Sequence, residues 1–352
     1  MSESSSPHRR RPRYHGKNPR RFAEKYTEHN PARYSATVAK VIAAGKTPAG
    51  SHRPIMVAEI LALLAPQPGE VAVDCTLGYG GHAEELLAHL QPGGHLLGLD
   101  ADPIELPKTA ARLRSLGFDA RVFTAQRTNF AGLPQALARA GLEGADVILA
   151  DLGVSSMQMD DPTRGFSAKH DGPLDLRMNP QRGQPASLFL QKIERDKLVR
   201  LLVENADEPH AAMLAPALVG RFFPGTKALS DAIRASLPRL EKAAADLSVR
   251  RVFQALRIAV NDEFSALETF LRNLPGCLRP GGRAVILTFH SGEDRRVKKA
   301  FADGLRDGFY TRIATDVIRP TAGERHSNPR STSAKLRWAR RGPGAVGFAK
   351  QI

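Results

Sequence analysis

The sequence contains very little cysteine, since Cys75 and Cys277 are the only two among 352 residues. They lie far apart and lack the Cys-x-x-Cys spacing of zinc sites, so we expect neither a disulfide framework nor a metal centre. A protein without disulfides suits a reducing compartment, and we expect a cytoplasmic location.

Long apolar runs are also missing. No stretch approaches the roughly 18–20 apolar residues that a helix needs to cross a bilayer, so we expect no membrane partner. The first residues are rich in arginine but contain no apolar core, and we therefore expect no secretory signal. Hydrophobic residues make up 42% and charged residues 25%, as in an ordinary globular protein. The length suits one large domain, or one domain with an insertion.

The charge is strongly unbalanced, with a formal net value of +15. Residues 1–48 hold 11 Lys and Arg against three Asp and Glu, and thus account for over half of this excess. Such a basic segment favours a polyanion such as RNA, with an affinity that depends on salt. A solvated tail that only aids solubility is the alternative.

From residue 52 onward, short apolar stretches alternate with helical patterns. The expected strands are 71–76, 95–100, 120–125 and 145–151, and the expected helices are 55–65, 83–90, 104–116 and 130–140. This alternation predicts a parallel sheet covered by helices on both faces.

The alternation is then interrupted. Residues 157–182 read as a loop and 185–258 as helices. A helix at 262–278 follows, then a Pro-Gly-Gly turn at Pro280 and a fifth strand within 278–290, a helix at 293–306 and a closing strand pair at 310–318 and 334–340. We therefore expect an α/β domain over 51–156 and 259–341, with a helical insertion domain over 157–258 between strands four and five. Residues 1–50 would form a partly disordered extension and 342–352 a tail.

A glycine-rich turn follows the first expected strand. Gly78, Gly80 and Gly81 would let the backbone approach a ligand, and the helix behind them favours polar or anionic groups. Asp100 ends the second strand, where nucleotide-binding folds place an acceptor for ribose hydroxyls. The pattern is neither G-x-G-x-x-G nor a Walker loop, so it indicates a nucleoside-type cofactor and leaves NAD and S-adenosylmethionine open. A purely structural turn is the alternative.

Two further polar residues end expected strands. Asp151 follows the fourth strand, where it could accept the N–H of an aromatic amine and align the nitrogen for methyl transfer. His290 ends the fifth strand and is a candidate for a contact with the base or backbone, or for a structural role. Basic residues that could meet phosphates follow it: Arg295, Arg296, Lys298 and Lys299.

Six stretches of the sequence, in order, carry a resemblance to a known family. They are HRPIMVAEIL (52–61), VDCTLGYGGHAEELL (73–87), GLDADP (98–103), ADLGVSSMQMDDPTRGFSAKHDGPLDLRM (150–178), FQALRIAVNDEFSALE (253–268) and LRPGGRAVILTFHSGEDRRVK (278–298). A seventh, NPRSTSAKLRWARR (328–341), looks like the family's tail. The sequence resembles the MraW/RsmH methyltransferases, whose members methylate the amino group of a decoding-centre cytidine in bacterial small-subunit rRNA.

This resemblance implies a class I (Rossmann-like) methyltransferase sheet with a helical insertion, S-adenosylmethionine as cofactor, and 16S rRNA or the 30S subunit as partner. It leaves open whether the chain forms a homodimer. In the implied cofactor site, Phe130 lies near the adenine, and Asp151 and Gln158 make polar contacts. The positions that match the family's site are Gly80, Gly81, His82, Asp100, Phe130, Asp151 and Gln158.

The sequence departs from the family in the expected insertion. Residues 203–211 and 247–252 differ from the usual pattern, and the first 50 residues have no counterpart in short members. Three other functions therefore stay open: a non-catalytic RNA-binding factor, a methyltransferase redirected to another nucleic acid, and a nicotinamide oxidoreductase.

Overall fold

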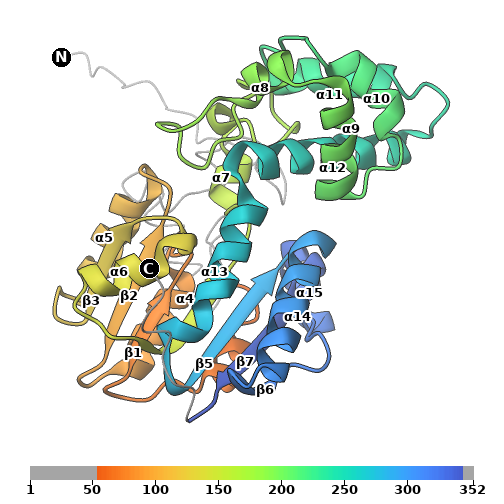
Figure 1. Ribbon diagram of the computed structural model, residues 1–352. Helices are drawn as coiled ribbons and strands as arrows, with labels where there is room; N and C mark the ends of the chain where they lie inside the picture. Colours follow the sequence, from red (N-terminus) through yellow and green to blue (C-terminus); the bar gives the residue numbers. More distant parts are fainter. Residues whose placement is uncertain (1–53, 344–352) are drawn as a thin grey trace, which may run out of the picture. The chain divides into compact units, whose positions relative to one another are not determined.

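The computed structural model describes residues 54–343 (Figure 1). From Pro54 onward the chain forms one compact unit. The predicted basic extension over residues 1–50 lies outside the described residues, as does the predicted tail beyond residue 343. Within the described part, no helix is long and apolar enough to cross a membrane.

One seven-stranded sheet forms the centre of the fold, in the order β3-β2-β1-β4-β5-β7-β6. The strands are β1 Val71–Asp74, β2 His95–Asp100, β3 Phe123–Arg127, β4 Ala145–Asp151, β5 Leu278–Thr288, β6 Tyr310–Ile313 and β7 Lys335–Arg341. The first five run parallel, and β7 pairs antiparallel with β5 and β6. This arrangement confirms the predicted α/β sheet of class I, Rossmann-like type.

Helices cover both faces of the sheet because alternate strand residues point to opposite sides. One face packs on α3 Val57–Leu64, α4 Gly81–Leu90 and α5 Glu105–Ser115. The other face packs on α6 Leu133–Arg139, α13 Glu263–Cys277 and α14 Ser291–Arg306. The short helices η2 Phe130–Gly132, α15 Ala322–Ser327 and η4 Pro329–Ser333 lie in connections. The prediction of helices on both faces is confirmed.

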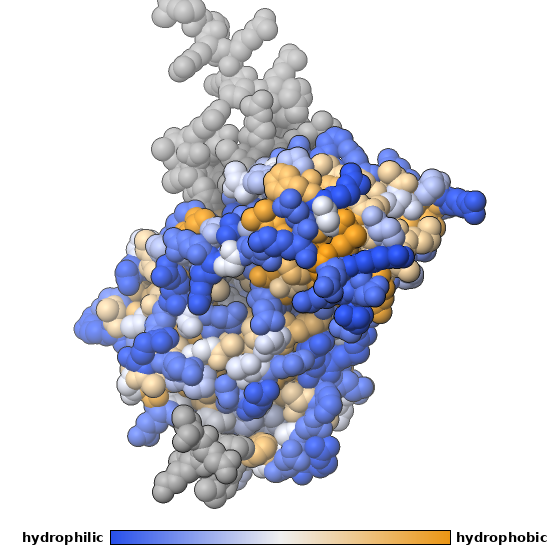
Figure 2. Space-filling view, turned by 45° about the horizontal axis from the view of Figure 1, so that its top comes forward, coloured by the Kyte–Doolittle hydropathy of each residue, from blue (hydrophilic) through white to orange (hydrophobic). Residues whose placement is uncertain are grey.

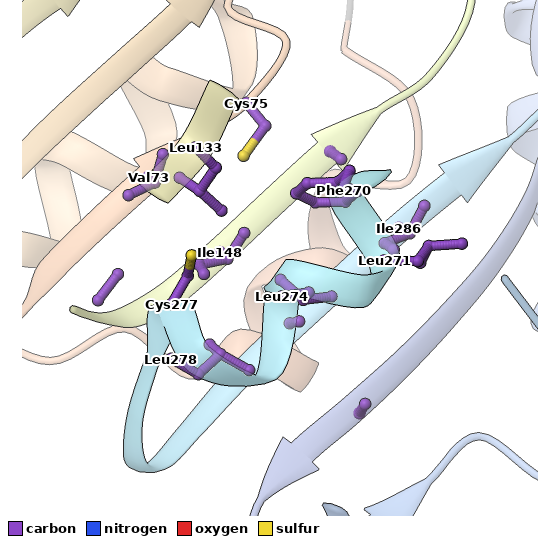
Figure 3. Packing of buried hydrophobic residues seen from close by; sticks show 14 of the residues in the cluster. Val73, Cys75, Leu133, Ile148, Phe270, Leu271, Leu274, Cys277, Leu278 and Ile286 are labelled. Carbon is purple, nitrogen blue, oxygen red and sulfur yellow. The ribbon is translucent and has the colours of Figure 1, made fainter. Parts of the chain in front are cut away.

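Helix α13 shows how the second face is filled. Its residues Phe270, Leu271 and Leu274 pack on strand residues such as Ile148 and Ile286 (Figure 3). The two cysteines belong to the same cluster, as free and buried thiols. Burial raises the pKa of the Cys277 thiol to about 12, so these residues act as small apolar groups.

The chain between β4 and β5 is mostly helical. It contains α7 Ser156–Asp160, η3 Pro162–Arg164, α8 Ala186–Lys192, α9 Arg195–Ala206, α10 Ala211–Leu218, α11 Thr226–Ala235 and α12 Lys242–Asn261. Helices α8 to α12 share a hydrophobic cluster of their own. Apolar side chains are also exposed among hydrophilic ones over these helices (Figure 2), and they include Met213 and Phe222. A separate domain over 157–258 stays a prediction.

Several boundaries differ from the sequence-based expectation, and β6, for example, ends at Ile313 rather than at residue 318. Strand β3 begins at Phe123 rather than at residue 120, because residues 119–122 form a turn that is closed by Asp119. Helix α12 continues to Asn261, three residues past the expected end of the helical stretch. The expected turn at Pro280 lies inside β5, where the pairing with β4 shifts register between Ala145 and Val147.

Candidate active site

The glycine-rich turn after β1 is held on both sides by hydrogen bonds. The Gly78 N–H donates to Asp100 Oδ2 at 2.7 Å, and Thr109 Oγ1 donates to the Gly78 carbonyl at 2.5 Å. Arg112 donates to the Tyr79 carbonyl at 2.8 Å, and its guanidinium lies 4.4 Å from the centre of the Tyr79 ring. The turn is therefore fixed before any ligand arrives, with its shape set by β2 and α5.

The three predicted glycines differ in what surrounds them. Gly78 has φ +48°, and a Cβ there would meet only the Thr76 carbonyl oxygen, at 3.7 Å, so this position leaves space for a ligand. A Cβ at Gly80 would lie 2.8 Å from Thr109 Cγ2, and one at Gly81 would lie 3.1 Å from the Pro54 ring. Close packing within the protein thus explains Gly80 and Gly81, and only Gly78 has the open space expected of a ligand contact.

Asp100 lies at the end of β2 beside this turn. Its Oδ1 accepts the Asp102 N–H at 2.8 Å while Oδ2 accepts the Gly78 N–H, so each carboxylate oxygen keeps acceptor capacity for a ligand hydroxyl. Burial raises the pKa of Asp100 to about 6. Phe130 lies at the same edge, since the Thr128 N–H bonds to the Asp100 carbonyl, and its ring packs edge-on against Phe270, 5.5 Å between centroids.

Asp151 ends β4 with an incompletely bonded carboxylate. Its N–H donates to Thr76 Oγ1 at 2.6 Å, which ties the end of β4 to the glycine-rich turn. Its Oδ1 is buried and has no hydrogen-bond partner among the described residues. The side chain nevertheless keeps 28% of its surface exposed. Burial, helped by the negative charge of Glu293, raises the pKa of Asp151 to about 7. An acceptor without a donor is thus available at this edge.

His82 faces Asp151 from the first turn of α4. Its Nε2 lies 2.9 Å from the Ile55 carbonyl, which can only accept, so this nitrogen carries the proton. Its Nδ1 lies 3.7 Å from Asp151 Oδ2. Burial lowers the pKa of His82, which favours the neutral ring, and burial raises the pKa of nearby Asp74 to about 6. His82 therefore packs beside Asp151 as a neutral ring rather than as a fixed countercharge.

His290 is placed beside a buried carboxylate. Its Nε2 lies 3.2 Å from Glu293 Oε1, and its ring packs 5.8 Å from that of Phe264. Burial raises the pKa of Glu293, but His290 and Arg257 outweigh it and the net pKa is lowered. Arg257 is itself fixed by two 2.8 Å bonds to Glu263. His290 thus belongs to a charged network next to Asp151, where it can orient a substrate.

Gln158, a predicted cofactor contact, has its side chain engaged within the protein. Its Nε2 donates to Asp102 Oδ2 at 2.8 Å, and its Oε1 accepts the Ser155 N–H at 2.9 Å in a capping box. Both polar atoms of the Gln158 amide are thus hydrogen-bonded within the protein, and one of them binds the loop after β2. Its contact with a cofactor stays a prediction.

Three of the four basic residues of α14 that were expected to meet phosphates form ion pairs at the protein surface, and their contacts with phosphates stay a prediction. Arg295 pairs with Asp207, Arg296 with Glu268 and Lys299 with Asp303. Lys298 is the only one of the four without an ion pair to a described residue. Ser291 also donates to Asp207, at 2.7 Å. The contacts of Arg295 and Ser291 join α14 to the end of α9, whereas Arg296 joins α14 to α13.

Sequence reasoning missed a buried ion pair between the sheet and the loop after β4. Arg164 Nη1 donates to Asp102 Oδ2 at 2.8 Å, and the two residues are 6% and 1% exposed. Arg164 also donates to the carbonyls of Arg177 and Met178. Because the partners are 62 positions apart, no local sequence pattern relates them. Their only signal in the sequence is that they lie in the stretches 98–103 and 150–178, which carry the family resemblance.

The described residues contain no group of three His, Cys, Asp or Glu side chains able to hold a metal ion. What they bring together at the ends of β1, β2, β4 and β5 is an open glycine, a strand-end carboxylate, a helix N-terminus and an unsatisfied acceptor. This set can bind a polar nucleoside and present an acceptor to an amine.

Comparison with known proteins separates two groups of relatives. "Ribosomal RNA small subunit methyltransferase H 1" of Lachnoclostridium phytofermentans is 48% identical over 96% of this chain and 94% of its own length. A relative from Alkaliphilus metalliredigens is 47% identical over 96% of this chain and 99% of its length. One from Geobacter sulfurreducens is 40% identical over 82% of this chain and 98% of its length. Because the first two matches cover 96% of this chain, they include most of residues 1–48, whereas the third covers 82%.

The model of one protein family matches residues 49–342. Its match spans every stretch on which the resemblance rested, together with the strand ends that form the candidate site. The chain belongs to the MraW methylase family, whose methyl donor is S-adenosylmethionine.

Proposed function

We propose that this protein transfers a methyl group from S-adenosylmethionine to the exocyclic N4 amino group of one cytidine in the decoding centre of 16S rRNA. The names of the relatives support small-subunit rRNA as the substrate. The single observation that carries the choice of an amino group is the buried, unpartnered Oδ1 of Asp151 at the end of β4.

The residues around the glycine-rich turn fit the cofactor. We propose that the cofactor packs against the protein backbone in the open space at Gly78. Asp100 would accept hydrogen bonds from the ribose hydroxyls of the cofactor, and the N-terminus of α4 would face its carboxylate. Phe130 would border the adenine. When bound, the cofactor supplies a methyl group on a sulfonium, which is already a good leaving group.

Asp151 would then orient the substrate amine. The lone pair of an aromatic amine is delocalised into the ring, so an acceptor that binds its N–H holds the nitrogen in line for attack. The ionised carboxylate can also take the proton that the amine loses after methylation. His82 Nδ1, 3.7 Å from Asp151 Oδ2, can share that proton. His290 would position the base through the Glu293 network.

The RNA-receiving part that we propose is the helical segment between β4 and β5, treated as an insertion domain over residues 157–258. The target cytidine must leave its stack before its amino group can reach Asp151. A 30S subunit offers such a base together with a large phosphate surface, which suits the net charge of +15. A cytoplasmic location and a homodimer stay predictions.

Incubation with labelled S-adenosylmethionine and undermethylated small ribosomal subunits, followed by nucleoside mass spectrometry, tests the proposal. We expect one N4-methylated cytidine in the decoding centre, formed about a hundredfold or more slowly by the Asp151→Asn variant. Label in another nucleoside or another nucleic acid would refute the proposed target. Cofactor binding without any transfer would identify a binding factor that has lost turnover.

A further inference from the structure

Three arginines lie side by side across the last strands of the sheet. In the register of β5, β7 and β6, Arg283 is opposite Arg340, and Arg340 is opposite Arg312. Directly opposed residues in an antiparallel pair have Cβ atoms about 4.5–5.5 Å apart and project from the same face. Like charges placed this way destabilise a sheet, so we expect an anion to neutralise these arginines.

The protein supplies an anion for only one of the three. Arg283 makes two 2.7 Å bonds to the Glu70 carboxylate and also donates to the carbonyls of Leu64 and Ala65. Neither Arg312 nor Arg340 has an ion pair with a described acidic residue, and both are exposed. Two guanidinium groups at the sheet edge thus keep their donors available.

The same arginines line a pocket with an aromatic wall. Its volume is about 430 Å³, and Trp338 lines it together with Arg312, Arg340 and residues of α3. The guanidinium of Arg312 lies 5.8 Å from the centre of the Trp338 ring. Pockets that hold a small ligand start at about 300 Å³, so one nucleotide fits this volume.

We propose that this pocket binds one nucleotide of single-stranded RNA, with its base stacked on Trp338 and its phosphates bound by Arg312 and Arg340. Aromatic stacking is favourable for any base, and the planar guanidinium group suits phosphate oxygens. A free nucleoside phosphate has the same chemistry and would bind in the same manner. The assignment does not depend on which base the protein methylates.

This nucleotide pocket is distinct from the candidate active site. Gln67 and Ala65, which line it, precede β1, and Arg283 lies in the first half of the pairing of β5 with β4. The pocket thus lies at the edge where the parallel strands begin, whereas Asp100 and Asp151 lie where strands end. An RNA strand bound here would anchor the protein away from the reacting base.

Tryptophan fluorescence gives a direct test because Trp338 is the only tryptophan in the chain. The full-length protein, with its active site saturated by S-adenosylhomocysteine, is titrated with cytidine monophosphate, inorganic phosphate and a short single-stranded oligoribonucleotide. We expect quenching by the nucleotide and the RNA, and weaker binding of inorganic phosphate. The variants R312Q and R340Q should each weaken both affinities about tenfold or more, as expected for the loss of one charge-assisted contact.

Arg114→Gln is the matched control, since it removes one exposed charge from α5, which packs by β3 at the other end of the sheet. It should leave the quenching unchanged. Tighter binding of the RNA than of the mononucleotide would identify an RNA strand as the ligand, and equal binding a free nucleotide. The proposal would be overturned by quenching that persists unchanged in R312Q and R340Q, or by no quenching at all. It would also be overturned if inorganic phosphate bound as tightly as the nucleotide. Methyl transfer, measured separately, tests the proposed function independently.

Discussion

At the scale of single residues, Asp151 combines a raised pKa with an oxygen that lacks a partner. A carboxylate at this position must be ionised to accept an amine N–H and to take its proton. With a pKa of about 7, caused mainly by burial, a large fraction is protonated just below neutrality. Activity at this site should therefore depend on pH near neutrality. An aspartate with an ordinary pKa is fully ionised there and would cause no such dependence.

We expect kcat/KM for RNA methylation to rise with pH through an apparent pKa of about 7, because this parameter reports on the free enzyme. Asp151→Asn keeps the size of the side chain but cannot take a proton. It should lower kcat by about a hundredfold or more and remove the pH dependence. Rate measurements from pH 5 to 9, with cofactor affinity by calorimetry as control, check this. An unaltered pH profile in the variant would contradict the role of Asp151.

The same raised pKa predicts an effect on stability. Because the pKa of Asp151 is higher in the folded protein than its ordinary 3.8, protonation favours the fold. That contribution is complete below pH 3.8 and is lost as pH rises through about 7. Asp151→Asn should therefore unfold at higher urea than the parent at pH 8. The gain in the free energy of unfolding should reach about 4 kcal/mol, because the pKa differs by about 3 between the folded and unfolded protein. The gain should shrink towards pH 4, and a gain independent of pH would count against this explanation.

Asp100 should govern cofactor affinity alone. Asp100→Asn removes one acceptor beside the glycine-rich turn, and we expect S-adenosylmethionine to bind about tenfold or more weakly, by calorimetry. Thr109→Val is the matched control, since it loosens the same turn by removing the bond to the Gly78 carbonyl but leaves the carboxylate in place. An equal loss in both variants would assign Asp100 a structural role only.

At the scale of elements, much of the fold and part of the site follow from the sequence. The strands were predictable because apolar runs end at Gly, Pro or Asp, and Asp100 and Asp151 were found because parallel strands end at one edge. Ion pairs between distant elements leave no such pattern. Arg295 pairs with Asp207, 88 positions away, which the sequence did not indicate, and the expected phosphate contacts of α14 stay a prediction.

The buried pair of Asp102 and Arg164 is the clearest contact that pattern reading missed. It fixes the loop after β4 to the loop after β2, which begins directly after Asp100 and is bonded to its carboxylate. Arg164→Met leaves a buried carboxylate without its cation, and we expect a loss of about 3 kcal/mol in the free energy of unfolding by urea denaturation. Combining it with Asp102→Asn should recover part of this loss, because the uncompensated charge is gone. Strictly additive losses would show that the two residues act independently.

At the scale of the whole molecule, positive charge and methyl-transfer chemistry are separable. Some relatives match 81–82% of this chain while 95–98% of their own length is covered, and the family match begins at residue 49, after the basic N-terminal segment. The candidate site is complete within residues 54–343. The residues proposed for the site all lie outside the segment over 1–48, and we propose that its 11 Lys and Arg residues bind a polyanion.

Deleting residues 1–48 should weaken RNA binding most at low salt and flatten the dependence of affinity on salt, because fewer phosphate counterions are released. Filter binding over a salt series measures this slope. A full-length variant in which the 11 Lys and Arg residues of the segment are replaced by Gln should behave like the deletion, since length alone contributes no counterion release. Cofactor affinity should be unchanged in both. If the slope stayed the same, the charge that binds RNA would have to lie outside residues 1–48, and Arg312 and Arg340 would be the first candidates.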